Sequence, residues 1–408
     1  MVFLSLAIKV IRIVFVLVIT AFYSLSQNGC IDINALNYNN LATINDGSCL
    51  YSTYNLTCPV LGIVPSQVSE SSGLILVGDR LWSHNDSGNS PKLFCFDTTT
   101  YTLIDTLIVG NATNVDWEDV AKSEESVFIG DFGNNNATRT DLKIYRIAMN
   151  DFLSNDTVDA ETISFSYPDQ LSFEPSSSHG FDCEAFYYFN DSLHLFSKHW
   201  GNGYTKHYVV PNEIGSHIAV FIDSLFVDGQ ITSADISNSG LVSLIGYSPP
   251  GYVPFMYLLW DYPSENVFNG NKRRLGMGNV FTMGQQEGIT FLSDNTGVIS
   301  SELITSPILI ESRFFKFNLN PVFNPSLGIG DLENEELKNP YPIPFINQFM
   351  LQETGFYSYS ILDAQGKVVL NGESKGPKLI LTDDLIKGTY LLVIEKDKII
   401  SKFRIVKM

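Results

Sequence analysis

Basic residues are scarce in this chain of 408 residues. Lys and Arg together number 25, against 44 Asp and Glu, and the formal net charge is −19. Binding to nucleic acid or to an anionic membrane surface needs clustered Lys and Arg. We therefore expect no nucleic acid partner. The acidic excess fits either a solvated surface or an affinity for calcium.

Metal and nucleotide signatures are also missing. The six His residues show no zinc-type spacing with one another or with Cys. The chain contains no P-loop, no G-x-G-x-x-G and no G-x-S-x-G sequence. No catalytic motif therefore stands out.

Cysteines are few, and their number is odd. With five of them, at least one is free or paired between chains. We expect Cys30 and Cys49 to form a disulfide, with Cys58 and Cys95 as a weaker candidate pair. Cys183 is expected to be a buried free thiol.

Long apolar runs are rare after the start of the chain. Lys9 and Arg12 precede the run IVFVLVITAF, and small residues follow in YSLSQ. This order predicts a signal peptide over residues 1–26, with cleavage near Ser26 and Gln27. An uncleaved anchor is the alternative, but the run is shorter than the roughly 20 residues of a spanning helix. After cleavage we expect no transmembrane span.

No long helical periodicity occurs between residues 55 and 320, where strand patterns dominate. Each of five short apolar runs is opened by an acidic residue, and neighbouring members of this set are 48, 66, 51 and 52 positions apart: Glu70, Glu118, Glu184, Asp235 and Glu287. A repeat near 50 residues with one strand-rich unit per repeat is typical of a β-propeller. We predict an all-β fold with five blades, or six if residues 150–178 hide another.

Two details of this prediction concern the fourth and fifth units. The fourth unit has no clear last strand, and we place it near GNVFTM, residues 278–283. The fifth unit lacks a fourth strand, which residues 55–64 can supply. A strand from the start of the chain would then close the ring and cover its open edge.

The five acidic residues are predicted to meet at one mouth of the propeller. Loops that carry His84 and His199 should reach the same face, because the second strand of each blade ends there. Carboxylates this close need a cation or hydrogen-bond donors, and Ca²⁺ accepts oxygen ligands in flexible geometry. Two hypotheses stay open: the carboxylates bind Ca²⁺, or each accepts hydrogen bonds within its own blade.

Three segments resemble known families. Residues 28–51, with the pattern GC-x-D-x-x-A-x-N-Y-N and a closing DGSC, resemble a short module of secreted Bacteroidetes proteins. The sequences ES-SG-L, LWSHNDSG, DWEDVA and GD-x-GNN are loosely similar to phytase-like and lactonase-type propellers. That resemblance implies acidic residues around an axial metal.

The end of the chain resembles the C-terminal sorting domain of type IX secretion cargo. The matching features are NPYPIPF, YSILDAQGKVV, the L-x-x-G-x-Y element and the closing KFRIVK. The resemblance implies contact with the type IX secretion machinery, and then release or attachment at the outer cell surface. Alternating strands in this segment predict a small Ig-like β-sandwich.

These features predict five segments: a signal peptide (1–26), a Cys-bounded module (27–54), a β-propeller (55–320), a linker (321–338) and a sorting domain (339–408). Two functions remain open. The first is a module that binds a surface glycan, a protein or a small molecule. The second is a calcium-dependent hydrolase of an ester, phosphoester or lactone, with His84 or His199 as general base.

Overall fold

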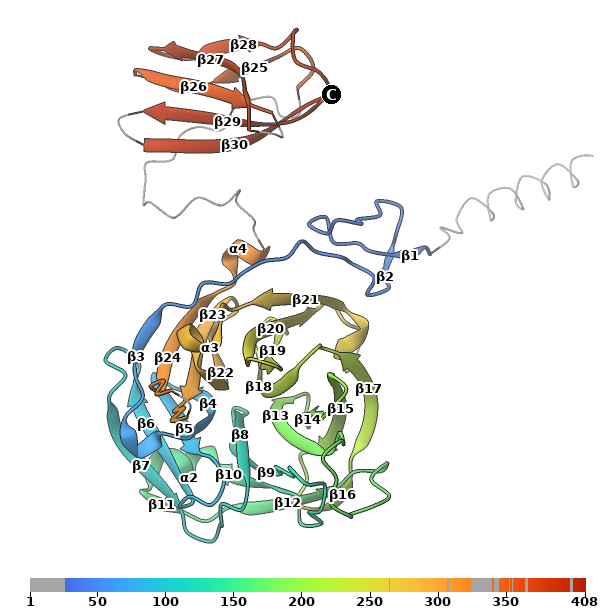
Figure 1. Ribbon diagram of the computed structural model, residues 1–408, viewed down its shortest axis with the longest axis vertical. Helices are drawn as coiled ribbons and strands as arrows, with labels where there is room; N and C mark the ends of the chain where they lie inside the picture. Colours follow the sequence, from blue (N-terminus) through green and yellow to red (C-terminus); the bar gives the residue numbers. More distant parts are fainter. Residues whose placement is uncertain are drawn as a thin grey trace, which may run out of the picture. The chain divides into compact units, whose positions relative to one another are not determined.

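The structure is a computed structural model that describes residues 26–263, 265–306, 308–323, 340, 345–351, 353, 355–363, 366–396 and 399–408. The expected signal peptide, apart from its last residue, and most of the expected linker lie outside these residues. The chain divides into two compact units, with the division after Asn320. Strands are the main regular elements of both units (Figure 1).

The described residues of the first unit form five mainly antiparallel sheets, besides a two-stranded parallel sheet in the Cys-bounded module. The first sheet contains β4 (Ser71–Val77), β5 (Arg80–Asn85), β6 (Lys92–Asp97), β7 (Leu103–Val109) and β11 (Thr157–Val158). The second contains β8 (Trp117–Lys122), β9 (Ser126–Asp131), β10 (Lys143–Ala148), β12 (Glu161–Ser166) and β16 (Gly215–Ile218). In both sheets the fifth strand is a short one that pairs in parallel with the outer edge.

The other three sheets have four strands each. The third contains β13 (Asp182–Phe189), β14 (Ser192–Lys198), β15 (Tyr204–Pro211) and β17 (Val220–Phe226). The fourth contains β18 (Gln230–Ile236), β19 (Val242–Ser248), β20 (Val253–Trp260) and β21 (Asn271–Gly276). The fifth contains β22 (Gln285–Ser293), β23 (Thr296–Glu302), β24 (Arg313–Asn318) and β3 (Val60–Ile63).

The first strands of these sheets lie side by side around a centre. Strand β4 adjoins β8, β8 adjoins β13, β13 adjoins β18, β18 adjoins β22, and β22 adjoins β4 again (Figure 1). Apolar side chains fill the spaces between neighbouring sheets; one such cluster includes Trp82, Trp117 and Ile129 and joins the first sheet to the second. The ring is therefore held by burial of apolar surface between sheets as well as by hydrogen bonds within each.

The expected pairing of an N-terminal strand with the last sheet is confirmed, because β3 pairs with β24. The placement of the fourth unit's last strand is wrong. The strand is β21, with the sequence NKRRLG, whereas residues 280–283 form the short helix α3 (Val280–Met283). The described residues between 150 and 178 add β11 and β12 to the first two sheets and form no sheet of their own.

Short helices connect some strands. They are α2 (Met149–Ser154), α4 (Asn320–Phe323) and the 3₁₀ turns η1 (Ser66–Val68) and η2 (Val267–Asn269). None of the described helices is long and apolar enough to cross a membrane.

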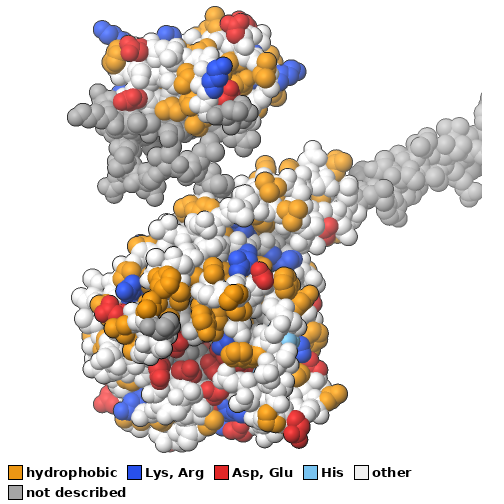
Figure 2. Space-filling model, viewed as in Figure 1, with side chains coloured by type: hydrophobic (Ala, Val, Ile, Leu, Met, Phe, Trp, Pro, Cys, Tyr) orange, Lys and Arg blue, Asp and Glu red, His pale blue; other side chains and the backbone are white. Residues whose placement is uncertain are grey.

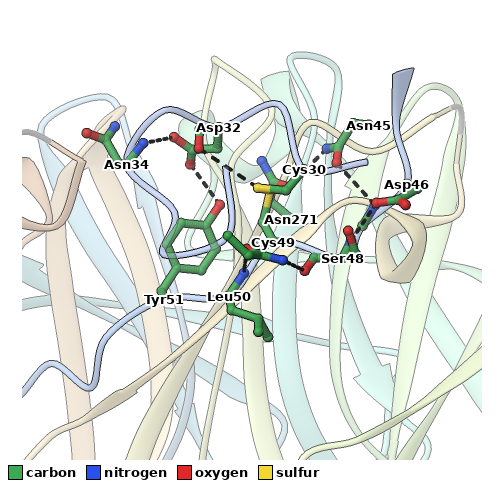
Figure 3. Close-up of a disulfide and its surroundings, with 12 residues drawn as sticks. Cys30, Asp32, Asn34, Asn45, Asp46, Ser48, Cys49, Leu50, Tyr51 and Asn271 are labelled. Atoms are coloured by element: carbon green, nitrogen blue, oxygen red, sulfur yellow. Dashed lines mark hydrogen bonds between the residues drawn. A yellow bond between two sulfur atoms is a disulfide. The ribbon is translucent and has the colours of Figure 1, made fainter. Parts of the chain in front are cut away.

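The Cys-bounded module lies against the fourth sheet. Its two short strands, β1 (Asn28–Gly29) and β2 (Ile44–Asn45), pair in parallel, and the expected Cys30–Cys49 disulfide is present (Figure 3). The Asn45 amide donates to Asn271 Oδ1 at 3.0 Å, and Lys272 Nζ donates to Gly47 O at 3.2 Å. These contacts fix the module to the outer strand β21.

Acidic side chains in the module are engaged locally. Asp32 accepts hydrogen bonds from Asn34 N at 2.8 Å and from the Tyr51 hydroxyl at 2.7 Å, and Asp46 accepts one from Ser48 N at 3.0 Å (Figure 3). Such side chain to backbone turns order a loop that has little core. The three remaining cysteines, Cys58, Cys95 and Cys183, are free, so the weaker candidate pair is wrong.

The described residues of the second unit form two sheets. One pairs β25 (Gln348–Leu351) with β28 (Lys378–Leu381); the other has β27 (Val368–Ser374), β26 (Tyr357–Leu362), β29 (Gly388–Lys396) and β30 (Ile399–Lys407) in that order. Its core includes Phe349, Tyr357 and Leu392.

Candidate functional site at the mouth of the ring

A β-bulge interrupts each of the five first strands near its start. The register with the second strand shifts after Ser72, Trp117, Cys183, Ile231 and Gln286. In three of the strands the extra residue is a glutamate: Glu118, Glu184 or Glu287. A bulge changes the direction of a side chain. Here it occurs near the start of the first strand in the second, third and fifth sheets.

Eight carboxylates act on one another at this end of the ring, which we call the mouth. They are Glu70, Asp86, Asp116, Glu118, Asp182, Glu184, Glu287 and Glu302. Acidic side chains gather in a hollow near the centre of the face in Figure 2. Among the described residues, only one cation forms an ion pair with any of the eight: Lys198 Nζ lies 3.0 Å from Glu184 Oε1.

Hydrogen-bond donors reach only some of the mouth carboxylates. Asp182 accepts from Asn134 N at 2.6 Å and from Trp200 Nε1 at 2.7 Å. Glu287 accepts from the Gln285 amide at 2.7 Å. By contrast, Glu118 is 96% buried, and no donor to its carboxylate occurs in the described part of the chain.

Two groups of three carboxylates have the spacing of a metal site. In the group of Asp86, Asp116 and Glu118, and in the group of Glu118, Asp182 and Glu184, one oxygen of each residue lies within 4.8 Å of the other two. Two calcium–oxygen distances of about 2.4 Å span this separation. Glu118 belongs to both groups.

Gly133 allows the carboxylates to approach the backbone. A Cβ atom at this position would lie 2.0 Å from Glu118 Oε1 and 2.5 Å from Asp116 Oδ2. Gly133 comes directly after Phe132 in the loop that follows β9. The observed positions of the two carboxylates therefore require a residue without a side chain here.

Burial and mutual repulsion favour protonation of the mouth carboxylates, or their binding to a cation. Burial, reinforced by Asp86 and Asp182, raises the pKa of Asp116 to about 7. Burial and then Glu184 raise the pKa of Glu118 well above its usual value. Carboxylates in this state gain from any cation that enters the mouth.

Not all predicted site residues lie here. Glu118, Glu184 and Glu287 lie together as predicted, and Glu70 contributes from the exposed rim, where it accepts from the Asn89 amide at 2.6 Å. Asp235 lies near the far end of β18, where it accepts from Ile236 N and Phe291 N and lines a cavity of about 430 Å³ with Lys122. Its placement at the mouth is wrong, since the bulge residue of β18 is Thr232.

The two histidines also differ from expectation. His84 is wholly buried, with Nδ1 against the Asn85 carbonyl at 3.0 Å and its ring edge-on to Trp117, and burial lowers its pKa to about 4. His199 lines a separate cavity of about 290 Å³ with Gln230 and Pro249. In the described structure neither histidine forms a hydrogen bond or ion pair with a mouth carboxylate.

Sequence reasoning missed two mouth residues that a simple pattern could have found. Asp116 and Asp182 each stand two positions before a bulge glutamate, in the sequences DWE and DCE. Alternate residues of an extended chain share a face. A repeated Asp-x-Glu at strand starts is therefore the signal that would have added both.

Asp119 is a further missed residue, with a structural role. Its carboxylate accepts from Val120 N at 2.9 Å, Phe186 N at 3.0 Å, Ala234 N at 3.2 Å and the Ser233 hydroxyl at 3.1 Å. These donors belong to β8, β13 and β18. Asp119 thus ties three first strands together beneath the mouth.

Comparison with known proteins identifies the end of the chain. Residues 339–408 match the family described as the secretion system C-terminal sorting domain. The chain is cargo of the type IX secretion system. The sorting domain directs it to the secretion machinery, and the protein is secreted or attached to the outer cell surface.

The rest of the chain was compared with curated proteins and with solved structures. No curated protein matches the sequence. A crystal structure of a protein of unknown function from Bacteroides caccae is similar over 71% of this chain and 92% of its own, at 10% identity and a TM-score of 0.27.

Proposed function

We propose that the first unit is a five-bladed β-propeller that binds a surface glycan, protein or small molecule through an acidic, calcium-binding mouth. Five sheets of at least four strands, with first strands adjoining in a ring and β3 closing the last sheet, support this architecture. The two sheets of the second unit support an Ig-like sandwich for the sorting domain.

The observation that carries the proposal is Glu118. Glu118 is a 96% buried residue whose carboxylate has no described donor and is shared by two groups of carboxylates, so it is costly to keep ionised without a cation. All the ligand atoms are carboxylate oxygens, which suit Ca²⁺ better than zinc or a soft metal. Asp86, Asp116 and Glu118 would hold the ion. When bound, it would supply positive charge and open coordination positions for a ligand.

The alternative, a calcium-dependent hydrolase of an ester, phosphoester or lactone, requires a base within reach of the ion. His84 is buried beneath the surface, and His199 lines another cavity. Because neither expected base forms a hydrogen bond or ion pair with a mouth carboxylate, we favour ligand binding over hydrolysis.

Calcium titration of the purified chain by calorimetry, with a thermal melt at each calcium concentration, tests the proposal. We expect calcium binding that raises the melting temperature, and an affinity at least tenfold weaker in Glu118→Gln, about 1.4 kcal/mol. Glu161→Gln is the matched control, because Glu161 pairs with Arg146 at 2.7 Å on the surface. Absence of both heat and a melting shift in the parent chain would refute the calcium site and leave the carboxylates structural.

A further inference from the structure

The geometry points to Lys198 as a tethered cation that fills the second of the two overlapping carboxylate groups, so that the mouth holds one divalent ion instead of two. The inference rests on the proposed calcium binding, and deepens it by assigning the residue that sets the number of ions.

The two groups divide the mouth into two halves that share Glu118. One half adds Asp86 and Asp116, and the other adds Asp182 and Glu184. Three carboxylate oxygens within 4.8 Å of one another can surround a single divalent ion in either half. By carboxylate content alone, the mouth would therefore suit two ions bridged by Glu118.

Only the second half contains a cation in direct ion-pair contact with one of its carboxylates. Lys198 Nζ is 3.0 Å from Glu184 Oε1, and the Lys198 side chain is 8% exposed. In the first half, no Lys or Arg forms an ion pair with Asp86, Asp116 or Glu118 among the described residues. Arg139 and Lys198 partly offset the raised pKa of Asp116 and of Asp86 without pairing with them. The first half is thus compensated only from a distance, whereas the second half contains an ion pair.

Lys198 is held in place from several directions. Its ammonium lies 5.2 Å from the ring centre of Trp200 and 5.8 Å from that of Tyr247, within the range of cation–π attraction. Trp200 in turn donates from Nε1 to Asp182 Oδ2 at 2.7 Å, so a carboxylate of the second half fixes one of the rings. These contacts hold the Lys198 ammonium in one place, unlike that of a surface lysine that moves in solvent.

The buried Glu118 is the independent sign that a further cation belongs in the first half. It has no described donor, and Gly133 leaves room for its carboxylate beside that of Asp116. An ammonium and a divalent ion cannot share the second half, because both need the same oxygens and repel one another. One ion in the first half and Lys198 in the second is the arrangement that pairs every carboxylate group with a cation.

Calcium stoichiometry of the purified full chain, measured by equilibrium dialysis and calorimetry, tests this assignment. We expect Lys198→Met to bind one more Ca²⁺ per chain than the parent, and Lys198→Arg to bind the same number as the parent. Lys206→Met is the matched control: Lys206 also lies over an aromatic ring, Phe181, and pairs with a carboxylate, Asp169, at 2.6 Å. It should leave the stoichiometry unchanged.

The outcomes separate the two ideas. A parent chain that binds no Ca²⁺ refutes the proposed function. A parent that binds calcium, with an unchanged count in folded Lys198→Met, refutes only the role of Lys198. If Lys198→Met unfolds without calcium, the inference requires millimolar calcium to refold it, because the second ion replaces the lost charge; failure to refold overturns it.

Discussion

Gly133 shows how a single position controls the chemistry of the mouth. The carboxylates of Glu118 and Asp116 occupy the space into which a side chain at 133 would project. No positive backbone angle is involved, so the requirement is one of space and not of conformation. A glycine in a loop after a strand is ordinarily explained by turn geometry. Here it leaves room for two carboxylates to come close to the backbone.

We expect Gly133→Ala to weaken calcium binding at least tenfold, because the added methyl group forces Glu118 and Asp116 apart. Calorimetry of the folded variant measures the effect. Gly376→Ala is the control, since a Cβ there meets no atom within 4 Å. Unchanged calcium affinity in Gly133→Ala would contradict the role given to these two carboxylates.

Asp119 is the residue on which the junction of three first strands depends. In Asp119→Asn, an amide NH₂ replaces one acceptor oxygen, and at least one buried N–H loses its partner. We expect a loss of about 1–3 kcal/mol in the free energy of unfolding. Urea unfolding measures it, with the exposed Asp105→Asn as control. Equal stability of the two variants would show that the bonds to Asp119 contribute nothing net.

At the scale of elements, apolar alternation predicted most strands of the five sheets, and the pairing of β3 with the last sheet followed from a missing strand. Strand β21 was missed because its sequence, NKRRLG, is polar and basic. Residues 280–283 form a helix because Asn279 caps it, accepting from Phe281 N and Thr282 N. Asp235 was misplaced because β18 begins at Gln230, five residues earlier, so that Thr232 stands at the bulge and Asp235 lies near the end of the strand.

Strands β14 and β15 carry a buried pair of histidines between the third and fourth sheets. His194 Nδ1 and His207 Nε2 lie 2.9 Å apart, and both side chains are wholly buried. Burial lowers the pKa of His194 to about 4, and burial with the neighbouring His194 lowers the pKa of His207 well below its usual value. Both histidines therefore remain neutral in the folded protein at neutral pH.

This pair should make the fold sensitive to acid. Between pH 6.5 and pH 4 the unfolded chain binds protons that the folded chain does not, so stability falls as the pH falls. His194 alone accounts for roughly 3 kcal/mol over this window. Between pH 6.5 and pH 4, we expect the free energy of unfolding to fall less in the double variant His194→Phe/His207→Phe than in the parent. Identical pH dependence in the two chains would contradict the assignment.

For the whole molecule, export and the proposed ligand binding belong to separate parts of the sequence. The sorting domain at residues 339–408 addresses the chain to the type IX machinery, while the acidic mouth is formed entirely by residues before 320. The sorting domain was predictable because its motifs are specific. The mouth was only partly predictable, since the carboxylates converge through strand register and bulges.

Removal of residues 339–408 should abolish arrival of the protein outside the cell in a host with a type IX system. Fractionation of cells and medium measures this. Glu118→Gln should be exported like the parent, because it leaves the sorting domain intact. Export of the truncated chain would show that a second address exists elsewhere in the sequence.

The pairing of β3 with β24 has a consequence for the order in which the protein matures. The partner of a strand that emerges near residue 60 is not synthesised until about residue 318. Until β24 has been made, β3 has no partner strand and the fifth sheet consists of β22 and β23 alone, so the circle of sheets stays open. Closure of the ring therefore requires almost the whole of the first unit, and a chain truncated before β24 would leave β3 without a partner.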